Sequence, residues 1–366
     1  MKTAKSILIL IILLSAFQAS AQDINYLGYK YSSRFHYGFI VPHHPPVKYL
    51  RKGHTPIYEL TVSKRMDGSK KWHSNYRHPW LGLGYNYSNF QYNEVLGSAH
   101  SLFSVIQIPI IERDKWMIDY SFSYGLGYVS KVFDVEENYY NIVIGSHFNA
   151  FLKLGFDISH NLSKDLKASY GISFQHYSNG SVRKPNLGIN QVALSLALSY
   201  EKYNKDWISI LHRPTTLNYR NEFLITGSGG WKQISVASPK IYPTFSSSIN
   251  YERILKKKHI GLGYDLFFDG SLPDVENKNA EFTGTKADRF RNGIHISYGL
   301  AFGKTVFTIQ TGYYLLLNHN TDGHLYNRFG LRYYFNNNMV ANITLKTHLG
   351  VADFVEWGIG YYIRRI

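Results

Sequence analysis

The sequence predicts an all-β fold, a transmembrane antiparallel β-barrel of about 14 to 16 strands in an outer membrane. Apolar and polar residues alternate over ten or more positions in many segments, and a period of two is typical of a long strand. These segments are about twice as long as the strands of about five or six residues in soluble sandwiches. They match the length that a tilted strand needs to cross a bilayer. The chain also has 31 Tyr and 22 Phe, an excess typical of strands whose rings lie at the membrane interfaces.

The alternation is clearest between Leu166 and Ser178, where even-numbered positions are mostly apolar and odd-numbered ones are polar or small. Sixteen segments of this kind can be counted, near 33–42, 55–65, 79–90, 99–112, 115–130, 141–159, 164–178, 189–202, 219–237, 239–255, 258–269, 289–303, 305–317, 325–336, 338–350 and 353–364. Bacterial barrels use even strand numbers, and strand boundaries derived from a pattern shift by a few residues. We therefore expect fourteen to sixteen strands.

The N-terminus has the features of a secretory signal peptide. Lys2 and Lys5 precede an apolar run that ends in Ala19-Ser20-Ala21, so residues 1–21 are predicted to be removed. This predicts export to the outer membrane of a Gram-negative bacterium. The chain has no Cys, so the exported fold must form without disulfides or thiolate metal sites.

No Pro/Ser-rich linker or tandem repeat divides the rest of the chain. We expect one barrel domain over residues 22–366, in which residues 22–203 carry the functional site and residues 204–366 add further strands. The alternative is an eight-stranded barrel followed by a second barrel.

Three polar residues are predicted to interrupt one apolar face. His176 and Ser178 continue the even-numbered, lipid-facing set of their strand, and Asn190 belongs to the lipid-facing set of the next strand. The loop between them, near 180–188, folds Asn190 back beside His176. If both chain termini are periplasmic, the three residues lie at the extracellular end, beside the outer leaflet.

Such a cluster could hydrolyse an ester. Ser178 would be the nucleophile, His176 the general base and Asn190 the residue that orients the imidazole. Asn179 or the backbone N–H of Gly180 could stabilise the oxyanion. The alternative is a polar rim at the end of the strand, where Asn179-Gly180 forms a hairpin turn.

The sequence around the three candidate residues also resembles a known family motif. His176-Tyr177-Ser178-Asn179-Gly180, followed by Lys184-Pro185-Asn186-Leu187-Gly188-Ile189-Asn190, resembles the signature of the outer-membrane lipid A 3-O-deacylase (acyloxyacyl hydrolase-like) family. The resemblance implies that His176 is the base, Ser178 the nucleophile and Asn179 an oxyanion donor. It also implies that Asn186 shapes or supports the loop.

Two features depart from the family pattern. The family has an acidic residue where this chain has Asn190. A Ser-His-Asn triad with a similar H-x-S-N-G motif is used by the outer-membrane phospholipase A family, so phospholipid remains an alternative substrate to lipid A. A typical deacylase barrel has eight strands, and this chain has room for about twice as many. A porin-like or structural barrel without activity is the non-enzymatic alternative.

The charge and the histidine content of the chain indicate which ligands it could bind. The formal net charge is +15, and Arg183 and Lys184 in the loop could attract the phosphates of lipopolysaccharide, unless such cations only line the lumen or the rim. No compact basic stripe indicates nucleic-acid binding. Neither His43-His44 nor His147 shows zinc-ligand spacing, so we expect no metal or other cofactor. Calcium would be expected only for a phospholipase. The sequence does not indicate an oligomeric state.

Overall fold

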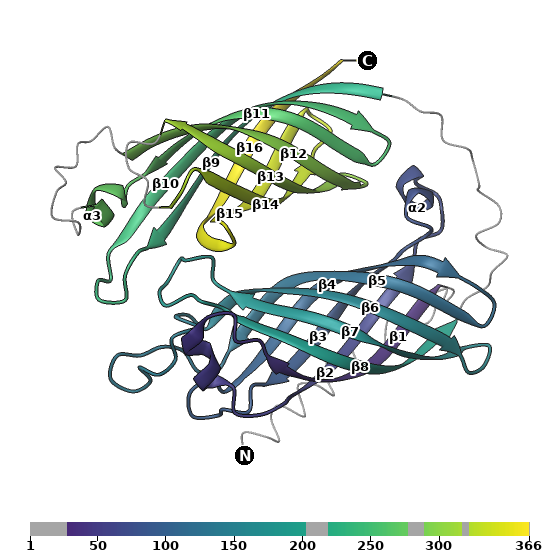
Figure 1. Ribbon diagram of the computed structural model, residues 1–366. Coiled ribbons are helices and arrows are strands. Elements are labelled where there is room, and N and C mark those ends of the chain that lie inside the picture. Colours follow the sequence, from purple (N-terminus) through teal and green to yellow (C-terminus); the bar gives the residue numbers. More distant parts are fainter. Residues whose placement is uncertain (1–27, 203–218, 277–288, 317–321, 366) are drawn as a thin grey trace, which may run out of the picture.

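Figure 1 shows the computed structural model, in which the chain forms two antiparallel β-barrels that lie side by side. The structure describes residues 28–202, 219–276, 289–316 and 322–365. The predicted signal peptide, 1–21, lies outside these residues. Among the described residues, none of the helices has the length and apolar character needed to span a membrane.

Eight strands close the first barrel, because the last one pairs with the first. They are β1 (Tyr29–Ile40), β2 (Thr55–Arg65), β3 (Trp80–Asn89), β4 (Ser98–Glu112), β5 (Trp116–Val129), β6 (Phe148–Asn161), β7 (Leu166–Ser178) and β8 (Ile189–Lys202). A 3₁₀ helix, η2 (Pro45–Leu50), and a short helix, α2 (Lys71–Asn75), lie in its loops.

The second barrel also has eight strands and closes by pairing β16 with β9. Its strands are β9 (Tyr219–Gln233), β10 (Ile241–Leu255), β11 (Lys258–Asp269), β12 (Phe290–Phe302), β13 (Thr305–Leu316), β14 (Leu325–Tyr334), β15 (Met339–His348) and β16 (Val351–Arg365). Helix α3 (Leu272–Glu276) follows β11.

The all-β fold and the upper strand number, sixteen in the described residues, are confirmed. The expected single barrel over 22–366 is not what forms: the strands close twice, and residues expected only to add strands make a barrel of their own. The physical reason is that alternation identifies each strand and its two faces but not its partner. One large barrel and two small ones require the same pattern of apolar outside and polar inside.

The two faces of each strand differ as the alternation predicts. On β8, Leu194 is 73% exposed on the outer wall, whereas the neighbouring Ala193 and Ser195 are buried on the inner face. The outer walls of both barrels carry many such exposed Leu, Ile, Phe and Tyr side chains. An apolar band of this extent is typical of a wall that contacts lipid.

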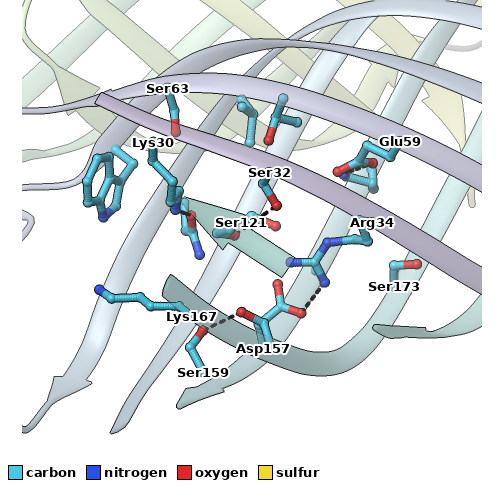
Figure 2. Close-up of a pocket in the computed structure, with 18 of the residues that line it drawn as sticks. Lys30, Ser32, Arg34, Glu59, Ser63, Ser121, Asp157, Ser159, Lys167 and Ser173 are labelled. Carbon is cyan, nitrogen blue, oxygen red and sulfur yellow. Dashed lines mark hydrogen bonds and ion pairs between the residues drawn. The ribbon is translucent and has the colours of Figure 1, made fainter. Parts of the chain in front are cut away.

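The first barrel's lumen is filled by polar side chains (Figure 2). Arg34 forms an ion pair with Asp157 at 2.5 Å, and Lys153 forms one with Glu59. A cavity of only about 40 Å³ remains between the lining side chains, room for about one or two water molecules. Eight strands leave an interior that side chains can fill. Polar residues and a buried apolar cluster that includes Phe103, Phe151 and Tyr177 fill this one, so the barrel is not an open pore.

The barrels touch at three levels. Near α2, the Tyr76 ring stacks on Phe302 with centroids 4.3 Å apart. On the outer walls, the rings of Phe122 and Phe307 lie 5.6 Å apart. At the other end, the loop after β7 contacts the ends of β9 and β16, where the teal and yellow segments meet in Figure 1.

Candidate functional site

Strand register brings the predicted residues together. His176 on β7 is directly opposite Asn190 on β8, so their side chains project from the same outward face of the sheet. Ser178 lies two residues beyond His176, at the end of β7 and on the same face. The parity of the sequence therefore identified neighbours that are 14 residues apart along the chain.

The three side chains form a hydrogen-bonded line. His176 Nδ1 lies 2.5 Å from Asn190 Oδ1, and His176 Nε2 lies 2.9 Å from Ser178 Oγ. Because an amide oxygen only accepts, Nδ1 carries the proton, and Nε2 of the neutral ring accepts from the Ser178 hydroxyl. The arrangement gives a serine whose proton a correctly oriented imidazole can remove.

The segment after Ser178 is a tight turn. Val182 N donates to Asn179 O at 3.3 Å, and Gly180 and Ser181 both have positive φ angles, +63° and +67°. Two central residues with positive φ characterise a type I′ turn. They are Gly180 and Ser181, so the turn lies one residue later than the Asn179-Gly180 pair that the sequence predicted.

Asn179 holds the loop together. Its Nδ2 donates to Ser146 Oγ and to Arg183 O, each at 2.9 Å, and its backbone N–H donates to Asn186 Oδ1 at 2.9 Å. Both amide hydrogens of Asn179 are therefore occupied, which disfavours its side chain as an oxyanion donor in this conformation. The N–H of Gly180 forms no hydrogen bond within the described part of the chain, so it is the available donor of the two expected ones.

The two predicted phosphate-binding cations differ in their surroundings. Arg183 is exposed beside the site. Lys184 is half-buried: its Nζ donates to Ser181 Oγ at 3.2 Å, and its backbone N–H donates to Gln233 Oε1 of the second barrel at 3.0 Å. Burial, and then the nearby Lys232 ammonium, lower the pKa of Lys184. Of the two, only Arg183 presents an exposed cation.

Sequence reasoning missed the residues that approach the site from distant strands. Val41 N, just after β1, donates to Asn190 O at 2.8 Å, and a ring nitrogen of His43 lies 2.9 Å from Leu187 O. Gln233 and Ala352 come from the second barrel. No local pattern could have identified them, because their proximity depends on the closure of β1 on β8 and on how the barrels meet.

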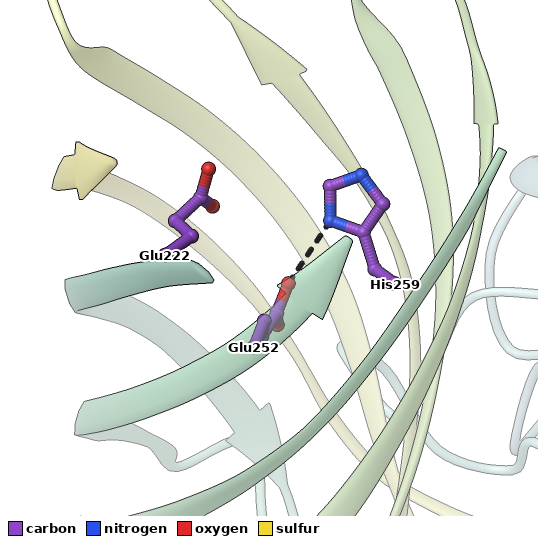
Figure 3. Close-up of side chains that lie close together, drawn as sticks. All are labelled: Glu222, Glu252 and His259. Atoms are coloured by element: carbon purple, nitrogen blue, oxygen red, sulfur yellow. Dashed lines mark hydrogen bonds and ion pairs between the residues drawn. The ribbon is translucent and has the colours of Figure 1, made fainter. Parts of the chain in front are cut away.

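One group of side chains has the spacing of metal ligands. Potential ligand atoms of Glu222, Glu252 and His259 lie within 4.8 Å of one another inside the second barrel (Figure 3). Arg364 pairs with Glu222 at 2.7 Å, and Arg332 pairs with Glu252 at 2.5 Å. Two guanidinium groups already balance the two carboxylates, so the group is best described as an ion-pair network. It lies near the start of β9, at the opposite end of that strand from Gln233.

Comparison with known proteins assigns each barrel to a described family. Residues 57–199 match the family described as "Lipid A 3-O-deacylase (PagL)", and residues 221–365 match the one described as "Acyloxyacyl hydrolase, C-terminal domain". The two ranges fall within the first and the second barrel, respectively. A search of curated protein sequences finds no match.

Solved outer-membrane proteins resemble roughly half of the chain. Neisserial surface protein A is 9% identical and covers 47% of this chain and 96% of its own, with a TM-score of 0.33. The outer membrane enzyme PagL is 19% identical and covers 46% of this chain and 97% of its own, with a TM-score of 0.31. The two family matches together extend over most of both barrels, and the chain belongs to the lipid A 3-O-deacylase family.

Proposed function

We propose that the protein is an outer-membrane serine esterase that hydrolyses an acyl ester of lipid A. The observation that carries the proposal is the hydrogen-bonded line from Ser178 through His176 to Asn190 on an outer wall that is otherwise apolar. Family membership supports the ester chemistry and the lipid A substrate.

The proposed reaction has two steps. His176 Nε2 takes the Ser178 proton as Oγ attacks the ester carbonyl, and the Gly180 N–H donates to the oxyanion. The imidazolium then protonates the departing alkoxide, which leaves an acyl group on Ser178. A water molecule, deprotonated by His176, releases the fatty acid and restores the enzyme.

Asn190 would orient the imidazole without supplying charge. Its Oδ1 accepts the Nδ1 proton and so keeps Nε2 free to act as the base. A carboxylate would in addition stabilise the imidazolium that forms in the transition state. We therefore expect Asn190 to support catalysis, but at a lower rate than the acidic residue that the family pattern has there.

Loop lengths support an extracellular position for the site. Ser178 lies at the same end of the first barrel as the long loops 41–54 and 130–147. At the opposite end, 113–115 and 162–165 are short, and only the connection 66–79, which contains α2, is long. Outer-membrane barrels have short periplasmic turns and longer extracellular loops. The Ser178 hydroxyl would then be level with the outer leaflet, where lipid A resides.

Phospholipid hydrolysis is the second candidate. One observation favours it: the residue that accepts from His176 is an asparagine, Asn190, and the outer-membrane phospholipase A family uses a Ser-His-Asn triad. A porin-like role is disfavoured, because side chains fill the lumen of the first barrel and buried ion pairs of Arg328 lie inside the second.

Mass spectrometry of membrane lipids from cells with and without the protein tests the proposal. Lipid A should lose one acyl chain when the protein is expressed, and Ser178→Ala and His176→Ala should abolish the loss. Ser169→Ala is the matched control, because Ser169 is on the same strand but faces the lumen. Heat-modifiable electrophoretic mobility reports folding of each variant. If lipid A is unchanged in cells that express the folded wild-type protein, the proposal is wrong. If lysophospholipid accumulates instead, the phospholipase alternative is supported.

A further inference from the structure

The second barrel contacts the loop that follows the candidate nucleophile. We propose that the second barrel completes the active site, and that Gln233 at the end of β9 is a positioning residue that holds loop 179–184 so that the Gly180 N–H faces the developing oxyanion. This inference rests on the proposed function and adds a role for the C-terminal half of the chain.

Gln233 binds the loop at two points. Its backbone N–H donates to Ser181 O at 3.0 Å, and its Oε1 accepts from Lys184 N at 3.0 Å. Its Nε2 donates to the carbonyl oxygens of Ser235 and Ser238, at 2.9 and 2.7 Å. Each polar atom of the side chain is therefore bonded, and the side chain is buried, so it is a fixed support for the loop.

The beginning of β16 supplies further contacts. Ser181 Oγ donates to Ala352 O at 2.7 Å. A Cβ atom added to Gly180 would lie 2.3 Å from Val355 Cγ2, so the Gly180 backbone packs directly against the outer wall of the second barrel. The candidate oxyanion donor is thus confined between the end of β7 and β16.

The conformation of the turn explains why such support matters. Ser181 has a φ of +67°, a region that non-glycine residues seldom adopt unless surrounding contacts impose it. Two of the contacts that Ser181 makes, through its carbonyl oxygen and its hydroxyl, go to the second barrel. Loss of these contacts would let the turn relax and would rotate the neighbouring Gly180 N–H.

Purified full-length variants in detergent micelles with lipopolysaccharide provide the test. Gln233→Leu removes the acceptor for Lys184 N, and Ser181→Ala removes the hydrogen bond to Ala352. Each should lower kcat about tenfold, the effect of one lost hydrogen bond. KM should change less than kcat, because the Gly180 N–H acts on the transition state, whereas Arg183 is the exposed cation of this loop that would bind the lipid. Gln310→Leu is the matched control, since Gln310 is buried in the second barrel's lumen, where its amide contacts His295.

Amide hydrogen exchange over residues 179–188 gives a second measurement that does not depend on activity. Gln233→Leu should speed exchange in this loop, and Gln310→Leu should not. Should Gln233→Leu fail to fold, Ser181→Ala alone decides, because it alters no residue of the second barrel. Variants with kcat within twofold of wild type and unchanged exchange would overturn the inference. A wild-type protein that releases no fatty acid would instead refute the proposed function, and loop exchange would then decide the positioning role.

Discussion

Replacement of Asn190 by leucine tests the weakest chemical element of the proposed triad. Leucine has nearly the shape of asparagine but offers no acceptor for the proton on His176 Nδ1, and this nitrogen now lies 2.5 Å from Asn190 Oδ1. Leaving a partly buried N–H without its acceptor costs about 1–3 kcal/mol, which corresponds to a loss of about 5- to 150-fold in kcat. The imidazole would also be free to take the tautomer in which Nε2 is protonated and cannot act as the base.

An acid at the same position should act in the opposite direction. Asn190→Asp keeps the length of the side chain and makes the hydrogen bond to the forming imidazolium charge-assisted, a gain of about 1 kcal/mol or about fivefold in kcat. Desolvation of the carboxylate opposes this gain. Asn190→Glu restores the residue type of the family pattern, but it is one methylene longer and must repack, so activity should hold or rise only modestly.

The assay is the initial rate of fatty-acid release from lipopolysaccharide in detergent micelles, measured by mass spectrometry. Asn327→Leu is the control, because Asn327 is also an outward-facing strand asparagine with one side-chain hydrogen bond, in which its Nδ2 donates to Thr311 Oγ1 in the second barrel. The expected order of rates is Asp above Asn, and Asn far above Leu. If Asn190→Leu hydrolyses lipid A as fast as the wild type, Asn190 does not orient His176 and the triad is wrong.

Three further predictions follow from the geometry. Gly180→Ala should lower kcat about tenfold or more, because the new methyl group meets Val355 and the residue must keep a positive φ; adding Val355→Ala should restore only part of the rate. Arg183→Ala should raise KM for phosphorylated lipid A but not for its dephosphorylated form, and the effect should weaken at high salt. The purified protein should give no stable conductance steps in planar bilayers, since side chains fill the lumen of the first barrel and the buried Arg328 pairs with Asp265 and Glu356 inside the second; regular steps would contradict this account.

The strands and their faces were predictable, because a period of two is a local property of the chain. The predicted strand 189–202 has the same bounds as β8. The predicted strand 164–178 starts two residues before β7 and ends at the same residue. The strand expected at 141–159 begins only at Phe148, because Asn141 instead donates two hydrogen bonds to the carbonyls of Val95 and Lys131 in a loop. The alternation of apolar and polar residues cannot reveal such hydrogen bonds from a side chain to the backbone.

The proximity of the candidate site residues was predictable for a similar reason, and only in part. His176, Ser178 and Asn190 lie on strands that are consecutive in the chain, so parity and one short loop were enough to bring them together. Gln233 approaches the loop only because β9 begins a new barrel that lies beside the first. The motif also could not predict that the Asn179 side-chain amide already donates hydrogen bonds, since its partner Ser146 lies in the preceding loop.

Few direct contacts join the two barrels within the described part of the chain, and their chemistry explains how they can suffice. Apolar walls have little reason to associate in lipid, where burial against protein replaces burial against acyl chains. The specific contacts lie near the barrel ends, in hydrogen bonds from Ser181 and Lys184 and in the stacking of Tyr76 on Phe302. Because both barrels belong to one chain, their association is intramolecular and needs far less binding free energy than that of two separate proteins. The covalent connection therefore makes a weak lateral contact dependable enough to carry part of the proposed active site.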